Sequence, residues 1–223
     1  MKNKHTAVWL LLGGFCLLSA LVLTLCLGFS SRLPENVGRP LTEEESAEII
    51  ARNSPLAEYV YLSPNGDFPR ADSIQRITVH HMADDMSLEE LGEAFGNWDR
   101  QASANYGIDS SGRVALYVEE ANRAWTSAHG GNDNQAVTIE VANDEIGGQW
   151  HVSDEAFETL VELCVDICRR NGIKELTYTG GEDGSLTTHK MFDGETMCPG
   201  PYLEGKLPEL ARRVSEELTE STD

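Results

Sequence analysis

The sequence is poor in basic residues, and this shortage argues against one large class of partner. Lysine and arginine number 17 against 37 aspartates and glutamates, so the formal net charge is −20. Nucleic-acid binding needs a basic face that neutralises phosphates. We therefore expect no nucleic-acid partner, and the acidity is explained by solubility.

Cysteine is also scarce, with five in 223 residues, which is too few for a disulfide framework. Cys164 and Cys168 are four apart in a helical pattern, where they fit small buried hydrophobes better than ligands or a bridge. A disulfide between them would close a very short loop and stabilise little. Cys198 is the one cysteine in a polar context rich in glycine and proline.

Only one long hydrophobic run is present, the 23 residues 7–29, preceded by Lys2 and Lys4. As a helix it would span a hydrocarbon core of about 30 Å. We expect residues 1–30 to form an uncleaved transmembrane anchor, which places the rest of this single-pass protein outside the cell membrane. The alternative is a cleaved secretory signal. Such signals typically have an apolar region shorter than this run and end at a small-x-small cleavage site. Either outcome exports the remainder.

Residues 31–72 are predicted to be a stalk or linker that contains a short acidic helix from Leu41 to about Arg52. The folded domain is expected to span residues 73–223. Residues 77–80 alternate between apolar and polar, which predicts a strand, and the β-branched run 136–141 predicts a central strand. Residues 106–108 and 114–118 flank a turn and predict a hairpin.

Helices are predicted over residues 88–98, after a capping box at Ser87 and Glu90, and from Ser153 to Asn171, where Gly172 ends an apolar stripe. A last helix is expected over residues 207–218. Strands mixed with helices in this way predict an α/β fold, a mixed central sheet flanked by helices, preceded by the N-terminal transmembrane helix.

Three residues have the donor types of a catalytic zinc site. His189 and Cys198 lie nine residues apart in a loop region, and His80 ends the predicted strand. Two imidazoles and a thiolate would leave the fourth tetrahedral position open, as catalytic zinc requires. His81 points to the opposite face of the strand, so only His80 is expected to reach the metal. Taken singly, each residue also fits an ordinary structural role.

Glu140 is the candidate general base, because it stands between Ile139 and Val141 near the end of the predicted central strand. A carboxylate buried there without a partner would cost several kcal/mol. A nearby metal site would compensate for this cost. An ordinary edge-strand glutamate is the alternative interpretation.

The order of these motifs resembles the zinc N-acetylmuramoyl-L-alanine amidases. This type 2 amidase family includes phage lysozyme-type amidases and animal peptidoglycan recognition proteins. The resemblance covers about Ile77 to Leu203 and rests on the following motifs: Val79-His80, Ser103-Ala104-Asn105-Tyr106, Ala124-Trp125, Thr138-Ile139-Glu140-Val141, Thr188-His189 and Thr196-Met197-Cys198-Pro199-Gly200.

The resemblance implies a peptidoglycan hydrolase that uses Zn²⁺. It implies that the metal ligands are His80, His189 and Cys198, and that Glu140 is the base. Thr196 falls where family members carry lysine or threonine to stabilise the oxyanion. A hydroxyl brings no charge there, so Thr196 is expected to be a weaker stabiliser than lysine.

The sequence also departs from the family pattern. Ala104 stands where some members have a catalytic tyrosine, and Asn105 replaces a common histidine. A Trp-His pair of the family is Trp125-Thr126 here. We expect Trp125 and Asn105 to contact substrate, although Trp125 also fits a core position.

The sequence is also compatible with two other functions. One is a non-catalytic muropeptide-binding module of the same fold, for which Ala104 leaves room. The other makes Cys198 a thiol nucleophile with His189 as its base. A helix N-terminus would lower the pKa of such a thiol, and the Pro199-Gly200 context does not place Cys198 at one.

Overall fold

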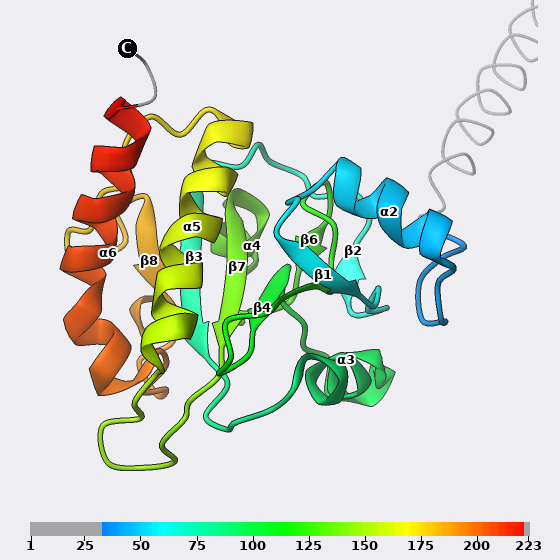
Figure 1. Ribbon diagram of the computed structural model, residues 1–223, viewed down its shortest axis with the longest axis horizontal. Helices are drawn as coiled ribbons and strands as arrows, with labels where there is room; N and C mark the ends of the chain where they lie inside the picture. The colour runs from blue at the N-terminus through cyan, green and yellow to red at the C-terminus, as the bar shows by residue number, and fades with distance from the viewer. Residues whose placement is uncertain (1–32, 221–223) are drawn as a thin grey trace, which may run out of the picture. The chain divides into compact units, whose positions relative to one another are not determined.

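A six-stranded sheet runs through the part of the chain that the computed structural model describes, residues 33–220 (Figure 1). Its strands lie in the order β1-β5-β4-β7-β3-β8, with a separate ribbon of β2 and β6 beside it. The bounds are β1 (Ala57–Val60), β2 (Gly66–Asp67), β3 (Arg76–His81), β4 (Tyr106–Ile108), β5 (Val114–Leu116), β6 (Arg123–Ala124), β7 (Ala136–Val141) and β8 (Leu186–Thr188).

Neighbouring strands of the large sheet are parallel except for the β4–β5 hairpin, so the predicted mixed sheet is confirmed. The hairpin turn is built by Asp109, whose Oδ1 accepts the backbone N–H groups of Ser111 and Arg113. Gly112 adopts a φ of +83° in this turn, a conformation that favours glycine.

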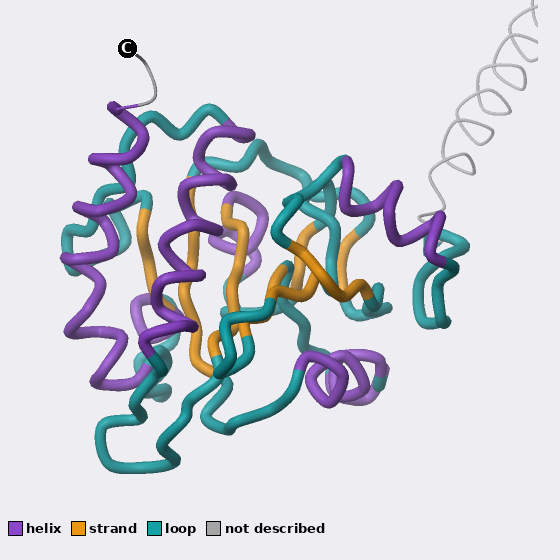
Figure 2. Tube along the Cα trace, in the orientation of Figure 1, coloured by secondary structure: helices purple, strands orange, loops and turns teal. Residues whose placement is uncertain are grey.

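Helices lie against the sheet, as the tube in Figure 2 shows. Their starts follow the predicted signals: capping boxes at Thr42 and Ser87, and an N-cap at Ser153. Gly172 ends the longest predicted helix with a φ of +71°. The bounds are α2 (Glu43–Ala51), α3 (Leu88–Gly96), α4 (Gly130–Gln135), α5 (Asp154–Asn171) and α6 (Gly200–Glu220), with 3-10 turns η1 (Trp98–Arg100) and η2 (His189–Met191).

The two faces of the sheet differ in chemistry. On β3 and β7, alternate residues enter the main hydrophobic core with α5 and α6; these are Ile77, Val79, Val137, Ile139 and Val141. Because side chains alternate along a strand, the residues between them point to the opposite face. These are Thr78, His80, Thr138 and Glu140. The opposite face therefore carries the polar groups of the candidate site.

The folded unit begins earlier than the sequence predicts. Residues from Pro34 onward form one compact unit, and β1, inside the predicted stalk, pairs with β5 at the edge of the sheet. The cause is burial: Ile49 of α2 and Ala57 of β1 both belong to the main core. The acidic helix itself is confirmed as α2.

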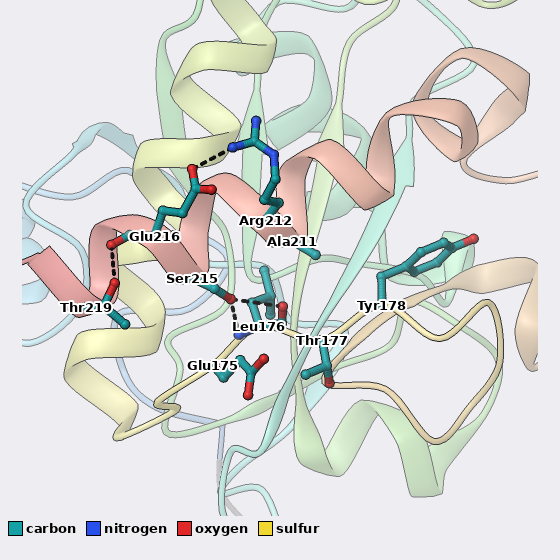
Figure 3. Close-up of a pocket in the computed structure, with 9 residues that line it drawn as sticks. All are labelled: Glu175, Leu176, Thr177, Tyr178, Ala211, Arg212, Ser215, Glu216 and Thr219. Atoms are coloured by element: carbon teal, nitrogen blue, oxygen red, sulfur yellow. Dashed lines mark hydrogen bonds and ion pairs between the residues drawn. The ribbon is translucent and has the colours of Figure 1, made fainter.

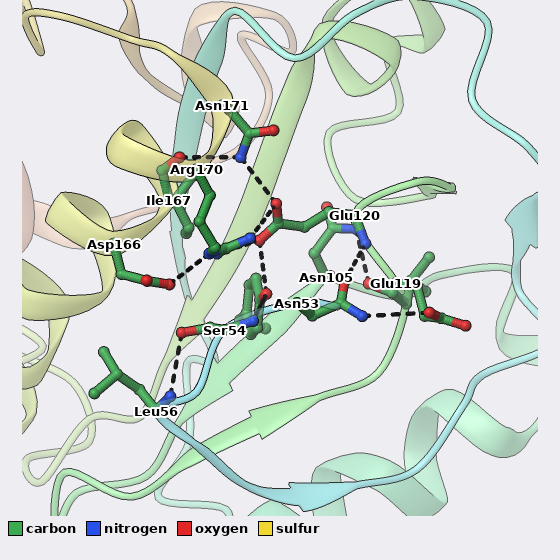
Figure 4. Close-up of polar contacts among 12 residues, drawn as sticks. Asn53, Ser54, Leu56, Asn105, Glu119, Glu120, Asp166, Ile167, Arg170 and Asn171 are labelled. Atoms are coloured by element: carbon green, nitrogen blue, oxygen red, sulfur yellow. Dashed lines mark hydrogen bonds and ion pairs between the residues drawn. The ribbon is translucent and has the colours of Figure 1, made fainter. Parts of the chain in front are cut away.

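A buried carboxylate attaches this early segment to the rest of the fold (Figure 4). Glu120 is 6% exposed and accepts hydrogen bonds from Arg170, Asn171 and the hydroxyl of Tyr106. The same hydroxyl accepts the backbone N–H of Ser54 at 3.0 Å. The chain at Ser54 is therefore connected to β4 and α5 through one polar network, which a free stalk would not be.

The last helix also begins earlier than predicted, at Gly200 instead of residue 207. Pro201 fits in the first turn, where proline loses no hydrogen bond, and Pro208, already within the predicted helix, is accommodated inside it. The buried residues extend the apolar stripe back toward the helix start: Leu203, Leu207, Leu210 and Val214.

The predicted anchor over residues 1–30 lies outside the described residues. Among residues 33–220, no helix is long and apolar enough to cross a bilayer.

Candidate metal centre

The three predicted ligands come together where β3 and β8 end. Val79 and Thr188 are paired across these neighbouring strands, so His80 and His189, the next residue on each, leave the sheet side by side. Cys198 approaches from the loop before α6. The potential ligand atoms of the three residues all lie within 4.8 Å of one another, and the Cys198 sulfur is 3.4 Å from Nδ1 of His80.

Each of the two histidines in this cluster buries a ring nitrogen that has no hydrogen-bond partner among the described residues. This atom is Nε2 in both His80 and His189. Burial lowers the pKa of both histidines and raises the pKa of the Cys198 thiol well above its usual value. Neutral imidazoles are the metal-binding form, and a cation would stabilise the thiolate. Two nitrogens and one sulfur are a zinc-type donor set.

Glu140 lies directly opposite His80 in the register of β7 and β3. Its Oε2 is buried without a hydrogen-bond partner. Burial raises the pKa of this carboxyl from 4.5 to about 8, against a smaller opposing effect of Arg100. β7 has strands on both sides, so the edge-strand interpretation of Glu140 is wrong.

Thr196 stands two residues before Cys198 and is partly exposed. Its hydroxyl oxygen accepts the backbone N–H of Cys198 at 3.1 Å. The hydroxyl hydrogen has no acceptor within residues 33–220, so it can be donated to a ligand.

Trp125 directly follows β6 and contacts Asp67 and Trp98. Its Nε1 donates to Asp67 at 3.0 Å, and its ring meets the half-exposed ring of Trp98 edge-on at 5.8 Å. Trp125 lines a hollow of about 300 Å³ together with Gln101, Ala102, Arg123, Thr126, Ala128, His129, Gly130 and Asp133.

This hollow is joined to the strand that carries Glu140. The Thr126 and Thr138 hydroxyls are 2.8 Å apart. Thr138 precedes Glu140 by two residues on the same face, which is roughly 7 Å along a strand. Trp98 is not among the predicted site residues, because the sequence shows it only as an aromatic residue just beyond a helix end.

Asn105 is completely buried, and both ends of its amide are used within the fold. Nδ2 donates to the carbonyl of Val118 at 2.9 Å, while Oδ1 accepts the backbone N–H of Thr138 at 3.0 Å. The structure therefore gives Asn105 a role in joining β4 to β7, in place of the predicted contact with substrate. Ala104, in the tyrosine slot, is buried in the cluster under α3 and adds no polar group.

His129 and Asn132 support the centre, although the sequence alone does not single them out. The His129 ring stacks on Phe192 at 5.2 Å, just beyond the turn that begins with His189. Asn132 donates to the hydroxyl of Thr78 at 3.0 Å, beneath His80 on β3. Both come from the region of α4, a short polar helix that has no apolar periodicity to mark it.

A second hollow, of about 490 Å³, lies far from these residues, between α6 and residues 175–178 (Figure 3). It includes Ala211 to Thr219 of α6, which are roughly 16–28 Å along the helix from Gly200. Ser215 bonds both the N–H and the carbonyl of Leu176 there. No histidine or cysteine lines this hollow, so it is not the chemical site.

This chain is similar in fold to several solved structures. No curated protein matches the sequence. Among solved structures, PlyL is similar at 18% identity and a TM-score of 0.52, over 75% of this chain and 91% of PlyL. The catalytic domain of XlyA is similar at 16% identity and a TM-score of 0.54, over 70% of this chain and 97% of that domain. The Staphylococcus aureus hydrolase AmiA in complex with its ligand is similar at 16% identity and a TM-score of 0.54, over 79% of this chain and 93% of AmiA.

At these identities the structures establish a shared fold, the mixed sheet flanked by helices. The sequence itself matches the profile of a family described as N-acetylmuramoyl-L-alanine amidase over residues 70–201, more than half of the chain. These residues include all three members of the metal-type cluster and Glu140. The chain belongs to the N-acetylmuramoyl-L-alanine amidase family.

Proposed function

We propose that this protein is a zinc-dependent N-acetylmuramoyl-L-alanine amidase. It hydrolyses the amide bond between the lactyl group of N-acetylmuramic acid and L-alanine of the peptidoglycan stem peptide. Family membership supports the reaction. The single observation that carries the zinc part is the cluster of two imidazoles and one thiol whose potential ligand atoms all lie within 4.8 Å of one another.

His80, His189 and Cys198 would hold the ion. Their fit to zinc is supported by the buried, unpartnered Nε2 atoms of the two histidines and by the nearby sulfur. When bound, zinc supplies a Lewis acid that polarises the amide carbonyl and acidifies a water molecule. The other steps belong to side chains of the protein.

Glu140 acts as the general base. Its unpartnered Oε2 takes a proton from the attacking water and returns it to the leaving nitrogen of L-alanine. The raised pKa of Glu140 in the metal-free site supports this role, because a base works best when its pKa is near the operating pH.

Thr196 donates its hydroxyl hydrogen to the oxyanion that forms on the attacked carbonyl. Trp125, on the wall of the adjacent hollow, contacts the muramoyl or peptide part of the substrate. The half-exposed Trp98 extends the same aromatic wall.

The test is metal content combined with cleavage. The purified full chain is expected to hold one zinc per molecule and to release stem peptides with a free L-alanine amine from muropeptides. Glu140→Gln should keep the zinc and lose the cleavage. Zinc without cleavage in the wild-type protein would support the non-catalytic binding module, and activity that survives complete zinc removal would revive the thiol nucleophile.

We further propose that residues 1–30 anchor the enzyme in the cell membrane, with the amidase outside. The proposal is supported by the 23-residue apolar run and the two lysines before it. Expression in a bacterial host followed by fractionation tests it. An anchored protein stays in the membrane fraction at its full mass, whereas a shorter protein in the medium would establish a cleaved signal.

A further inference from the structure

His81, next to the ligand His80, points away from the metal centre and packs against the start of α6. A Cβ added at Gly200 would lie 3.1 Å from both Cε1 and Nδ1 of His81, and 3.2 Å from Cβ of Trp150. Gly200 has a φ of +84°. The backbone of Gly200, two residues after Cys198, therefore lies close to the His81 ring on one side and to Cβ of Trp150.

A chain of hydrogen bonds fixes the orientation of the His81 ring. Nδ2 of Asn143 donates to the carbonyl of Trp150 at 2.8 Å, so its Oδ1 is the acceptor for Nδ1 of His81 at 3.0 Å. This assigns the proton to Nδ1. The rings of His81 and Trp150 meet edge-on at 5.4 Å. The imidazole therefore has one favourable rotamer, set by the loop that carries Trp150.

The backbone at the same position lies next to Cys198. The N–H of His81 faces the Cys198 sulfur. On the other side, the N–H of Lys190 donates to the Cys198 carbonyl at 3.1 Å. Strand β3 and turn η2 thus hold the cysteine between them, and the contact with Gly200 sets where the loop leaves toward α6.

We infer that His81 and Trp150 clamp Gly200 and so hold the Cys198 sulfur at the metal centre. His81 is a positioning residue for the metal although it binds none itself. The inference rests on the proposed zinc site. Residues that orient a metal ligand typically change metal affinity by about 10- to 100-fold when they are lost.

The experiment compares zinc affinity in the full chain by competition with a chromogenic chelator. His81→Ala is expected to weaken zinc binding by about 10- to 100-fold. His151→Ala is the matched control, because that imidazole bonds Asp144 and packs on Tyr202, and it is not among the side chains nearest to a Cβ at Gly200. It should bind zinc as the wild-type protein does. Trp150→Leu removes the ring that meets His81 edge-on and so loosens the His81 side of the clamp, which should weaken binding in the same direction.

Cobalt substitution separates positioning from general packing. Thiolate-to-cobalt charge transfer reports the sulfur ligand alone, so the clamp predicts a weakened or shifted band in His81→Ala and an unchanged band in His151→Ala. Wild-type affinity and an unchanged band in both clamp variants would overturn the inference while the zinc site stands. A wild-type protein that binds no zinc would overturn the proposed function itself, and the clamp with it.

Discussion

His80 and Glu140 lie directly opposite each other on the neighbouring parallel strands β3 and β7. The residues before them, Val79 and Ile139, are paired on the other face and completely buried in the main core. A slip of one residue would send Glu140 into that core, which its hydrophobic neighbours forbid. The distance between the proposed base and the first ligand is therefore set by strand register, and not by a flexible loop.

The stability of the metal-free protein should depend on Glu140 in a defined direction. Its pKa in the fold is raised from 4.5 to about 8, so its unfolded form loses the proton first. Full stability is thus present below about pH 4.5 and is lost as the pH rises toward 8. Glu140→Gln, which has no proton to lose, should melt at an increasingly higher temperature than the wild-type protein across this range. A difference that is constant with pH would contradict the burial of the carboxyl.

Removing zinc should lower the thermal stability of the protein. An ion bound only to the folded state stabilises it by about 4 kcal/mol when its free concentration is 1,000 times the dissociation constant. A chelator should therefore lower the melting temperature, and added zinc should restore it. Cys198→Ala is the control, since loss of the sulfur ligand should remove most of this response. An equal response in that variant would place the stabilising zinc elsewhere.

Thr196 should affect the rate more than substrate binding. Loss of one oxyanion donor typically lowers kcat by about 10²- to 10³-fold, and a neutral hydroxyl belongs at the lower end. Thr196→Val keeps the shape and removes the donor, whereas Thr196→Ser keeps the hydroxyl. We expect kcat to fall on the order of 10²-fold in the first variant and to stay near the wild-type value in the second. An equal fall in kcat in both variants would mean that the shape of the side chain, and not its hydrogen-bond donation, determines the rate.

Glu120 should be a major contributor to folding although it is remote from the chemistry. Glu120→Ala leaves the half-buried Arg170 and the buried Tyr106 hydroxyl without their carboxylate. Arg170 keeps its ion pair with Asp166, so the cost is that of leaving a buried hydroxyl and a partly buried guanidinium short of one acceptor, about 1–3 kcal/mol. Glu158→Ala removes a pair with Arg213 in which the carboxylate is mostly exposed, and should cost under about 1 kcal/mol. Equal denaturation midpoints for the two variants would show that Glu120 stabilises the fold no more than the exposed Glu158 does.

The local features of the fold could be predicted from the sequence because their signals are local. The β3 strand, the capped helices and the hairpin each follow from a few adjacent residues. Cys198 stood out because of its polar context, and alternation along β3 assigned His80 and His81 to opposite faces. Cys198, in the loop before α6, and His80, on β3, are 118 residues apart in sequence and are brought together only by tertiary packing.

The features that pattern reading missed depend on tertiary contacts. Residues 57–60 look like part of a linker until their pairing with β5 is seen. Asn105 looks like a ligand-binding amide until Val118 and Thr138 use both of its ends. The last helix is predicted only from residue 207, whereas it begins at Gly200 because Leu203 and Leu207 are buried.

In the proposed mechanism, His80, His189 and Cys198 hold a zinc ion, and Glu140 cleaves the muramoyl–L-alanine amide with its help. Mass spectrometry of a defined muropeptide, incubated with the zinc-loaded full chain, tests it most directly. We expect two products from the wild-type protein, a free muramic acid carboxylate and a stem peptide with an L-alanine amine, and neither product with Glu140→Gln. An intact muropeptide in the presence of bound zinc, or equal cleavage by the variant, would contradict it.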